Sequence, residues 1–352
     1  MKILAIETSC DETAAAVAED FACGVKILSN IVSSQIDIHK KYGGVVPEVA
    51  AREHVLDILP VIDQALEEAG IKRDNLVNKK LDAIAVTIGP GLMSSLQTGV
   101  ETAKNLAYVW ELPIVGVNHV EGHIYANFIN LEKKINFPSL ILTVSGGHTM
   151  LVLMRGHGDF EIIGDTRDDA AGEAFDKAAK LMNLGYPGGP IISERAKEHR
   201  VVSGNNYEID SKLPRPMIQS DNFDFSFSGL KTAIRYKIEK DKDWKNRINE
   251  YCYEFQEAVV DVLVFKTIKA VKKYGIKTVL LAGGVATNGR LREVLKKTIL
   301  EKLDGARFIK PDIKYTTDNA AMIASAGLFR ANNDNFVDWR DLRANCNYPL
   351  SH

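Results

Sequence analysis

The sequence predicts an α/β protein in which helices cover β-sheets. Short runs of β-branched and apolar residues alternate along the chain with longer segments whose apolar residues recur every three or four positions. The chain has 352 residues, of which 45% are hydrophobic, and such a length is typical of about two domains with ordinary cores. A short internal repeat predicts that the two domains share one plan.

The first part of the chain is expected to build one sheet with its helices. The predicted strands lie at residues 2–6, 14–18, 26–32, 81–88 and 114–117. Three helices are predicted. The first lies at 47–69, the second follows the strand 81–88 and runs to Tyr108, and the third begins at His119. This alternation of strand and helix indicates a sheet that is covered by helices.

A second set of strands begins after residue 138. The expected strands lie at residues 139–144, 150–154, 161–164 and 278–282. Helical spacing dominates between 171 and 273, and a helix of small residues runs from Asp318 to Ala331. The second half is therefore also α/β, with more helix.

The repeat links one hairpin of each half. In each, a strand ends at a serine, three residues turn, and a threonine starts the return strand: Ser9 with Thr13, and Ser145 with Thr149. Both pairs are separated by the same offset of 136 residues. Duplicated domains that face each other across a cleft explain this match, and coincidence between two hairpins is the alternative.

Charge and cysteine usage exclude several classes of protein. The formal net charge is −2, so a nucleic acid would have to meet a local basic surface or a partner. The four cysteines are far apart and form no CxxC pair, which argues against a disulfide framework and against a cysteine zinc site.

Membrane and secretory segments are not expected. Glu7 interrupts the apolar run at the N-terminus, and the longest uncharged stretch, 83–100, carries Gly89-Pro90-Gly91 at its centre. We therefore expect a cytoplasmic protein without a membrane association.

Two histidines four residues apart indicate a metal site. His119 and His123 would lie on the same face of a helix, where neutral imidazoles chelate a divalent transition ion well. Two partly exposed helix histidines are the alternative. Glu121 lies about 200° around the helix from His119 and faces away, so this is not the HExxH arrangement of zinc proteases.

A third ligand is expected from Asp318, at the start of the small-residue helix. Two histidines and one carboxylate, with open positions, suit Fe²⁺ or Zn²⁺ that acts on a ligand. The competing interpretation is that Asp318 caps the helix.

Glycine-rich turns follow several strands and favour a nucleotide in the interdomain cleft. They are Ser145-Gly146-Gly147-His148, Tyr186-Pro187-Gly188-Gly189-Pro190 and Gly283-Gly284-Val285-Ala286-Thr287-Asn288. Glycine lets backbone N–H groups approach phosphate or ribose, although tight turns use the same residues. An acidic helix start that includes Asp176 could hold ribose hydroxyls or simply complement the helix dipole. Neither GxxxxGK[ST] nor GxGxxG is present, which disfavours P-loop and Rossmann binding.

Taken together, these motifs resemble the tRNA N6-adenosine threonylcarbamoyltransferase family (TsaD, once described as a glycoprotease), in its bacterial branch. The matching segments, in order, are AIETSCDETAAAV from Ala5, GGVVPEVAAREH from Gly43, GPGLMSSL from Gly89, NHVEGHIYAN from Asn118, VSGGHT from Val144, GEAFDKAAKLMNLGYPGGP from Gly172, FSFSGLKTA from Phe225, GGVATNGRLR from Gly283 and TDNAAMIA from Thr317.

The resemblance implies an actin-like (ASKHA), duplicated ribonuclease H-like fold with two lobes around a nucleotide cleft. The first lobe is expected at 1–108 plus 319–340, the second at 109–318 with helical insertions, and a C-terminal tail at 341–352. The implied reaction transfers a threonylcarbamoyl group from threonylcarbamoyl-AMP to N6 of adenosine 37 in tRNAs that read codons starting with A.

The resemblance also assigns site residues and a cofactor. One divalent ion per chain, with Fe²⁺ favoured and Zn²⁺ possible, is expected on His119, His123 and Asp318. The implied substrate contacts are Thr143, Val144, Ser145, Gly146, Gly147, Asp176, Gly189 and Asn288. Asp11 or Glu12, in the first hairpin, is expected to accept the amine proton or to position the base, and ordinary turn chemistry is the alternative.

The implied partners are tRNA, a TsaB-type paralogue and a TsaE-type ATPase, and a homodimer is a further expectation. The helices at 47–69 and 92–108 are the expected partner surface. Two other functions are weighed: an actin-like ATP-binding scaffold, which would have no need of a metal site, and a metallopeptidase, which the position of Glu121 disfavours.

Overall fold

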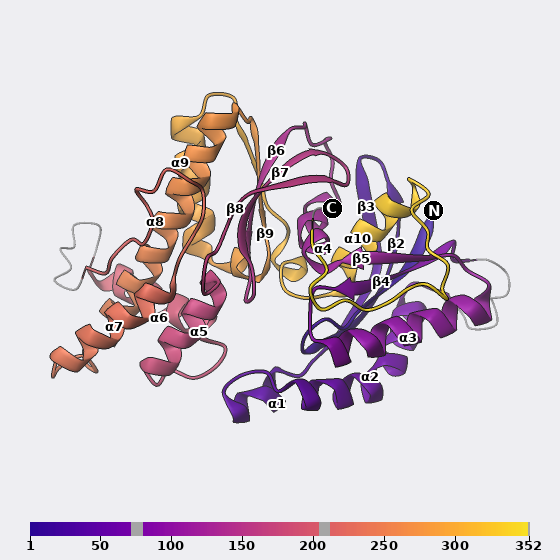
Figure 1. Cartoon of the computed structure of the whole chain (residues 1–352), viewed down its shortest axis with the longest axis horizontal. Helices are drawn as coiled ribbons and strands as arrows, with labels where there is room; N and C mark the ends of the chain where they lie inside the picture. The colour runs from indigo at the N-terminus through magenta and orange to yellow at the C-terminus, as the bar shows by residue number, and fades with distance from the viewer. Residues whose placement is uncertain (72–79, 204–211, 351–352) are drawn as a thin grey trace. The chain divides into compact units, whose positions relative to one another are not determined.

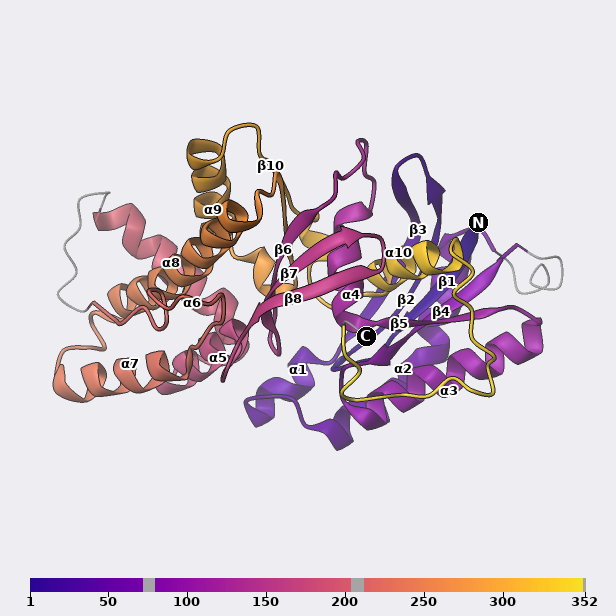
Figure 2. The ribbon, with the colours of Figure 1, turned by 45° about the horizontal axis from the view of Figure 1, so that its top comes forward.

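The computed structural model describes residues 1–71, 80–203 and 212–350. Within this part the chain forms two compact units (Figures 1 and 2). Unit 1 comprises Met1–Ile135, His157–Asp159 and Pro311–His352, and unit 2 comprises Asn136–Gly156 and Phe160–Lys310. Each unit contains one five-stranded sheet.

The sheet of unit 1 has the strand order β3-β2-β1-β4-β5. Its strands are β1 (Lys2–Glu7), β2 (Glu12–Phe21), β3 (Gly24–Ser34), β4 (Ala83–Gly89) and β5 (Ile114–Asn118). Strands β1, β2 and β3 pair antiparallel, whereas β1, β4 and β5 run parallel. The carboxyl ends of β1, β4 and β5 therefore meet at one edge of the sheet, where α/β proteins commonly bind ligands.

Helices cover both faces of this sheet. They are α2 (Pro47–Glu68), α3 (Met93–Trp110), α4 (His119–Tyr125) and α10 (Ala320–Ala331), while the short helix α1 (Ile36–His39) precedes α2. Helices α2 and α3 lie on one face of the sheet and α10 on the other (Figure 1). Leu4 and Ile6 of β1 pack in one core with residues of α2 and α3, while Ile3 lies beside Gly327 of α10. This alternation follows from the two-residue period of a strand, and burial of both faces explains why β1 is apolar up to Glu7.

The sheet of unit 2 repeats that topology in the order β10-β9-β6-β7-β8. Its strands are β6 (Ser139–Val144), β7 (Thr149–Gly156), β8 (Asp159–Asp165), β9 (Thr278–Ala282) and β10 (Arg307–Ile309). The two hairpins also share their register: Ile6 pairs with Ala15, and, 136 residues on, Leu142 pairs with Leu151. The predicted duplication is confirmed at the level of strand order and register.

Helices of unit 2 account for most of its additional length. They are α5 (Ala171–Leu181), α6 (Gly188–Ser203), α7 (Ser228–Lys240), α8 (Ile248–Tyr274) and α9 (Gly289–Lys302). One core joins Leu140 and Leu142 of β6 to Phe175 of α5 and to Phe255 and Val259 of α8. The predicted helical stretch 171–273 is confirmed where the structure describes it; residues 204–211 lie outside the described part.

The compact units differ from the predicted lobes at several boundaries. Strand β5 belongs to the first sheet because it pairs with β4, although the predicted boundary follows residue 108. Helix α4 also belongs to unit 1, because it begins directly where β5 ends. Strand β10, with three residues, carried too short a pattern to be predicted. The division into functional lobes at 1–108 with 319–340, 109–318 and 341–352 stays a prediction.

None of the described helices is both long and apolar enough to cross a membrane.

We expect Gly283→Ala to destabilise unit 2, because Gly283 adopts a φ of +89° that L-residues rarely populate. A Cβ there would also clash with the backbone oxygen of Val144. A loss of about 1–3 kcal/mol should appear as a lower thermal midpoint. Gly284→Ala is the matched control, since its Cβ would meet no atom within 4 Å; equal midpoints for the two variants would contradict the conformational role given to Gly283.

Candidate metal centre

Helix α4 begins at the carboxyl end of β5 because Asn118 caps it. The side-chain oxygen of Asn118 accepts hydrogen bonds from the backbone N–H groups of Val120 (2.8 Å) and Glu121 (3.2 Å). A helix of seven residues has little stability of its own. The Asn118 cap and the packing of α4 against its neighbours therefore stabilise it. The cap places His119 in the first turn and His123 one turn later.

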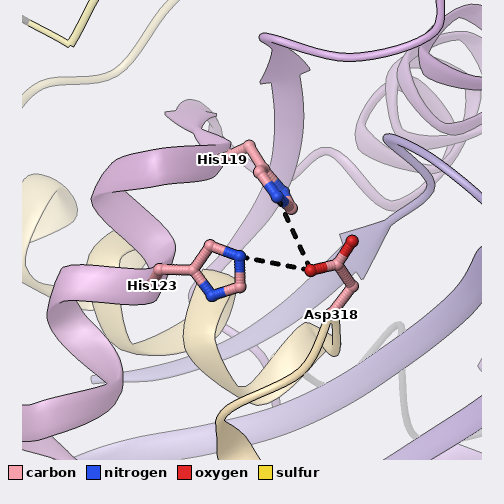
Figure 3. Close-up of side chains that lie close together, drawn as sticks. All are labelled: His119, His123 and Asp318. Atoms are coloured by element: carbon pink, nitrogen blue, oxygen red, sulfur yellow. Dashed lines mark ion pairs between the residues drawn. The ribbon is translucent and has the colours of Figure 1, made fainter. Parts of the chain in front are cut away.

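The two histidines lie on one face of α4, as predicted (Figure 3). Their ring centroids are 4.7 Å apart with an interplanar angle of 79°. His119 is 8% exposed and His123 is 1% exposed, so the alternative of two partly exposed histidines is wrong.

Asp318 joins the histidine pair from a distant part of the sequence. Its Oδ1 lies 3.2 Å from Nε2 of His123 and 3.6 Å from Nε2 of His119. One ligand atom from each of the three residues lies within 4.8 Å of the others. The competing interpretation, that Asp318 caps α10, is wrong: Asn319 is the cap, and its side chain accepts from the N–H of Met322 (3.2 Å).

The donor set fits a divalent cation. Neither ring nitrogen of His123 makes a hydrogen bond within the described part of the chain, although both are buried. The approach of its Nε2 to Asp318 therefore lacks hydrogen-bond geometry. Buried polar atoms rarely remain without a partner, and two imidazoles with one carboxylate are a usual ligand set for Fe²⁺ or Zn²⁺. The residues present can hold a metal ion.

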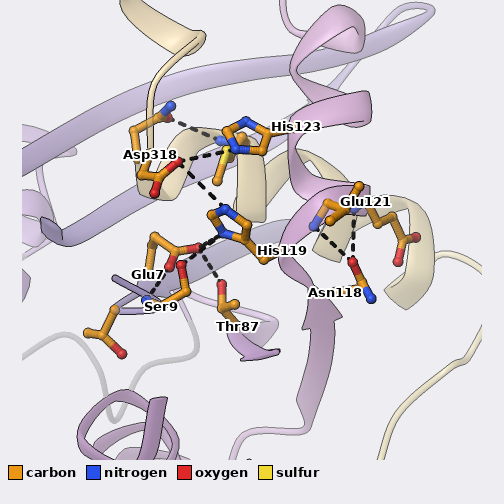
Figure 4. A network of polar contacts seen from close by, with 12 residues as sticks. Glu7, Ser9, Thr87, Asn118, His119, Glu121, His123 and Asp318 are labelled. Atoms are coloured by element: carbon orange, nitrogen blue, oxygen red, sulfur yellow. Dashed lines mark hydrogen bonds and ion pairs between the residues drawn. The ribbon is translucent and has the colours of Figure 1, made fainter. Parts of the chain in front are cut away.

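Glu7, which the sequence patterns did not reveal, orients His119 (Figure 4). Its Oε2 lies 3.2 Å from Nδ1 of His119 and accepts a 2.6 Å hydrogen bond from the Thr87 hydroxyl. The Ser9 hydroxyl lies 3.0 Å from the same Nδ1. Because an ionised carboxylate can only accept, we assign a proton to Nδ1, and Nε2 is the ring atom turned toward Asp318.

The pKa shifts of Glu7 and His119 show that the carboxylates of this site favour a positive charge beside them. Burial raises the pKa of Glu7, but the nearby His119 outweighs it and the net shift is downward. Burial lowers the pKa of His119, yet the carboxylates of Asp318 and Glu7 raise it to about 9. Without a metal the His119 ring is therefore positively charged at neutral pH, with a proton on each nitrogen. A divalent cation would replace the proton on Nε2.

Asp11 and Glu12 lie at the turn between β1 and β2, in the same unit as the histidine pair. Burial, with the carboxylates of Asp318 and Asp11, raises the pKa of Glu12 well above its ordinary value. A raised pKa favours the protonated form of Glu12 and also makes its carboxylate a stronger base, and Asp11 is 7% exposed, so both carboxyl groups are candidates for the proton acceptor.

His54 of α2 holds this turn in place. Its Nε2 lies 3.0 Å from the carbonyl oxygen of Cys10, and its Nδ1 lies 2.8 Å from the Thr13 hydroxyl. A carbonyl can only accept, so Nε2 carries the proton and Nδ1 accepts from Thr13. The segment GGVVPEVAAREH thus ends in a residue that fixes both sides of the Asp11–Glu12 turn.

The first group of predicted substrate contacts lies at the β6–β7 turn of unit 2. Thr143 and Val144 are buried at the end of β6, and the Thr143 hydroxyl makes no hydrogen bond within the described residues. The hydroxyl of Ser145 accepts from the N–H of His148 (3.0 Å). Gly146 and Gly147 are exposed, and a Cβ on either would meet no atom within 4 Å.

The remaining predicted contacts are tied to helix starts. Asp176 accepts a 2.7 Å hydrogen bond from the N–H of Gly188 and another from Gly189, while burial raises its pKa. Asn288 caps α9 through its oxygen, which accepts from the N–H of Leu291. The nitrogen of Asn288 donates to Ser193 (2.7 Å) and Gln256 (3.0 Å). Both amide atoms of Asn288 are therefore engaged in structural bonds.

Comparisons with known proteins agree with this arrangement. The model of the TsaD family, tRNA N6-adenosine threonylcarbamoyltransferase, matches residues 26–325. The tRNA N6-adenosine threonylcarbamoyltransferase of Dehalococcoides mccartyi is 54% identical over 330 residues, 94% of each chain. The enzyme of the same name from Geobacillus thermodenitrificans is 50% identical over 327 residues, 92% of this chain and 90% of the relative.

Solved structures show the fold. The crystal structure of T. kodakarensis HypF aligns with a TM-score of 0.61 at 14% identity and covers 97% of this chain and 49% of that one. A full-length HypF structure aligns with a TM-score of 0.57 at 15% identity, over 94% of this chain and 55% of that one.

The two five-stranded sheets of like topology and the alignment with HypF show the actin-like (ASKHA) α/β fold, in which each unit is ribonuclease H-like. Within that class, the chain belongs to the TsaD family of tRNA N6-adenosine threonylcarbamoyltransferases.

We expect Glu7→Gln to weaken divalent-ion binding by about ten- to a hundredfold, the usual effect of losing a carboxylate that orients a metal-bound histidine. Whichever oxygen is replaced, the new NH₂ faces a donor, either the Ser9 N–H or the Thr87 hydroxyl. Competition with a chelating dye measures the affinity. Asp57→Asn, which alters a bond to Ser33 on β3, is the control; unchanged affinity in Glu7→Gln would contradict the role given to Glu7.

Proposed function

We propose that the chain carries out its family's reaction with one divalent ion held by His119, His123 and Asp318. The chain is a transferase of tRNA modification, which forms threonylcarbamoyladenosine at position 37. The single observation that supports the metal role is the buried His123 ring beside Asp318, whose two nitrogens make no hydrogen bond among the described residues. Fe²⁺ is our favoured ion, and Zn²⁺ accepts the same ligands.

In the proposed reaction, N6 of adenosine 37 attacks the carbamoyl carbon of threonylcarbamoyl-AMP. A new N–C bond forms, the C–O bond to the phosphate breaks, AMP leaves, and the amine loses a proton. A divalent ion at the cluster supplies Lewis-acid chemistry toward a carbonyl or phosphate oxygen. Asp11 or Glu12 accepts the amine proton or positions the base.

Residues of unit 2 bind the adenylate in this proposal. The exposed backbone at Gly146 and Gly147 offers N–H groups to negatively charged oxygens. Ser145 is buried and holds the turn, because its N–H donates to the carbonyl of His148 (2.8 Å). The Thr143 hydroxyl and Val144 lie directly before this turn. Asp176 accepts from the N–H groups of Gly188, where α6 begins, and of Gly189, and helix starts favour anions. Asn288 acts by holding the start of α9.

We expect His123→Ala to lose both the bound ion and transfer, and Asp11→Asn to keep the ion but lose single-turnover transfer. The ion is measured by elemental analysis after anaerobic purification. Transfer is measured by nucleoside analysis of tRNA incubated with threonylcarbamoyl-AMP and the partner proteins. Full activity of verified metal-free protein would contradict the metal role, and unimpaired transfer by Asp11→Asn would remove the assignment of Asp11.

The partners in this proposal are tRNA, a TsaB-type paralogue and a TsaE-type ATPase. A net charge of −2 supports the need for further subunits in tRNA binding. Helix α2 exposes Val55, Leu56 and Leu59, which are 63%, 67% and 57% accessible, and such apolar patches are typical of protein interfaces. We assign the paralogue to this face of α2 and the adjoining α3; a second copy of the chain is the alternative occupant.

We expect Leu56→Glu and Leu59→Glu to abolish association with the paralogue, because each buries a charge in an apolar interface. Sedimentation of the mixed proteins measures complex formation. Val201→Glu is the control, since Val201 on α6 of unit 2 is 77% exposed. Unchanged association in both α2 variants would contradict the assignment.

A further inference from the structure

Helix α4 carries its two histidines on one face and packs its other face against α10. Asp318 lies directly before α10. We propose that Glu121, Gly122 and Arg330 are positioning residues that fix the histidine pair relative to Asp318, and that they thereby set the affinity and coordination geometry of the metal site. This inference rests on the proposed metal function.

The pair Glu121–Arg330 connects the two helices by a charged contact. One carboxylate oxygen of Glu121 accepts from Nε (2.9 Å) and from Nη2 (2.6 Å) of Arg330. The Glu121 side chain is 1% exposed and that of Arg330 is 26% exposed. Charge-assisted hydrogen bonds of this kind are strong, and removing one partner leaves the other charge buried and unpaired.

Gly122 allows the helices to approach closely between the two histidines. A Cβ at position 122 would lie 2.6 Å from Cδ1 of Ile323 and 3.7 Å from the backbone carbon of Met322. Ile323 is fully buried, so its side chain has little freedom to give way. Any larger residue at 122 moves α4 away from α10, or displaces Ile323.

The direction of these contacts explains why they act on the metal site. Glu121 lies about 200° around the helix from His119, so a rotation of α4 that carried the histidines away from Asp318 would also pull Glu121 from Arg330. The Ser325 hydroxyl adds a third tie, a 2.9 Å hydrogen bond to the carbonyl of Tyr125. The three ties lie along α10 and resist both rotation and sliding of α4.

The test uses the full-length, metal-free chain titrated with Co²⁺, whose visible absorption reports ligand geometry and whose affinity follows from competition with a chelator. We expect Glu121→Gln and Arg330→Gln each to weaken Co²⁺ binding about tenfold or more and to alter the absorption bands. The double variant should lose no more than either single variant, because the pair acts as a unit. Arg330→Lys should recover part of the affinity.

A size exchange tests Gly122 separately. Gly122→Ala should weaken Co²⁺ binding, and adding Ile323→Val, which removes the clashing Cδ1 atom, should restore affinity and spectrum. This pair keeps the inference testable if a charge variant does not fold.

The matched control is Glu257→Gln, which breaks the ion pair with Arg290 in unit 2 (2.8 and 2.6 Å). It should leave Co²⁺ affinity and spectrum unchanged. Failure of the wild-type chain to bind Co²⁺ would overturn the proposed metal function and this inference with it. Binding by the wild type, with unchanged affinity and spectrum in the Glu121, Arg330 and Gly122 variants, would overturn the inference alone.

Discussion

The site depends on the convergence of three parallel strands at one edge of the first sheet. Strand β1 ends at Glu7, β5 ends at Asn118, and Thr87 lies near the end of β4. Because the strands are parallel, their carboxyl ends lie side by side. Glu7, Thr87 and the start of α4 therefore meet without any long loop, and Glu7 can fix the tautomer of His119.

Electrostatics makes this edge specific for a cation. Two carboxylates, Glu7 and Asp318, face His119 in a buried setting, and their charge is balanced by a proton on that ring. Burying such charges without a counter-charge is costly. A divalent ion held by Asp318, His119 and His123 would supply that counter-charge, while Glu7 would keep the Nδ1 proton of His119 in place.

Corresponding turns of the two duplicated sheets carry different residues. With the offset of 136 residues, the β1–β2 turn corresponds to the β6–β7 turn, so that Glu7 corresponds to Thr143 and Asp11 to Gly147. The turn of unit 1 carries carboxylates, whereas that of unit 2 has glycines with an exposed backbone. Acidic side chains suit proton and metal chemistry, and bare backbone amides suit phosphate.

Periodicity was sufficient to predict the sheets, most helices and the shared face of His119 and His123. It also placed Glu121 on the opposite face, where the structure shows it bound to Arg330. It could not identify Glu7, because a strand-end carboxylate shows no pattern until its partners, Thr87 and His119, are known. Whether Asp318 or Asn319 caps α10 depends on which of these two neighbouring residues starts the helix. Sequence patterns do not locate a helix end to within one residue.

The metal centre is tested most directly by X-ray absorption spectroscopy of the anaerobically purified, iron-loaded chain. We predict an ion with two imidazole nitrogens and at least one carboxylate oxygen in its first shell, and no such iron signal from His119→Ala loaded in the same way. A spectrum without imidazole scattering, or one that is unaffected by the substitution, would contradict the proposed centre.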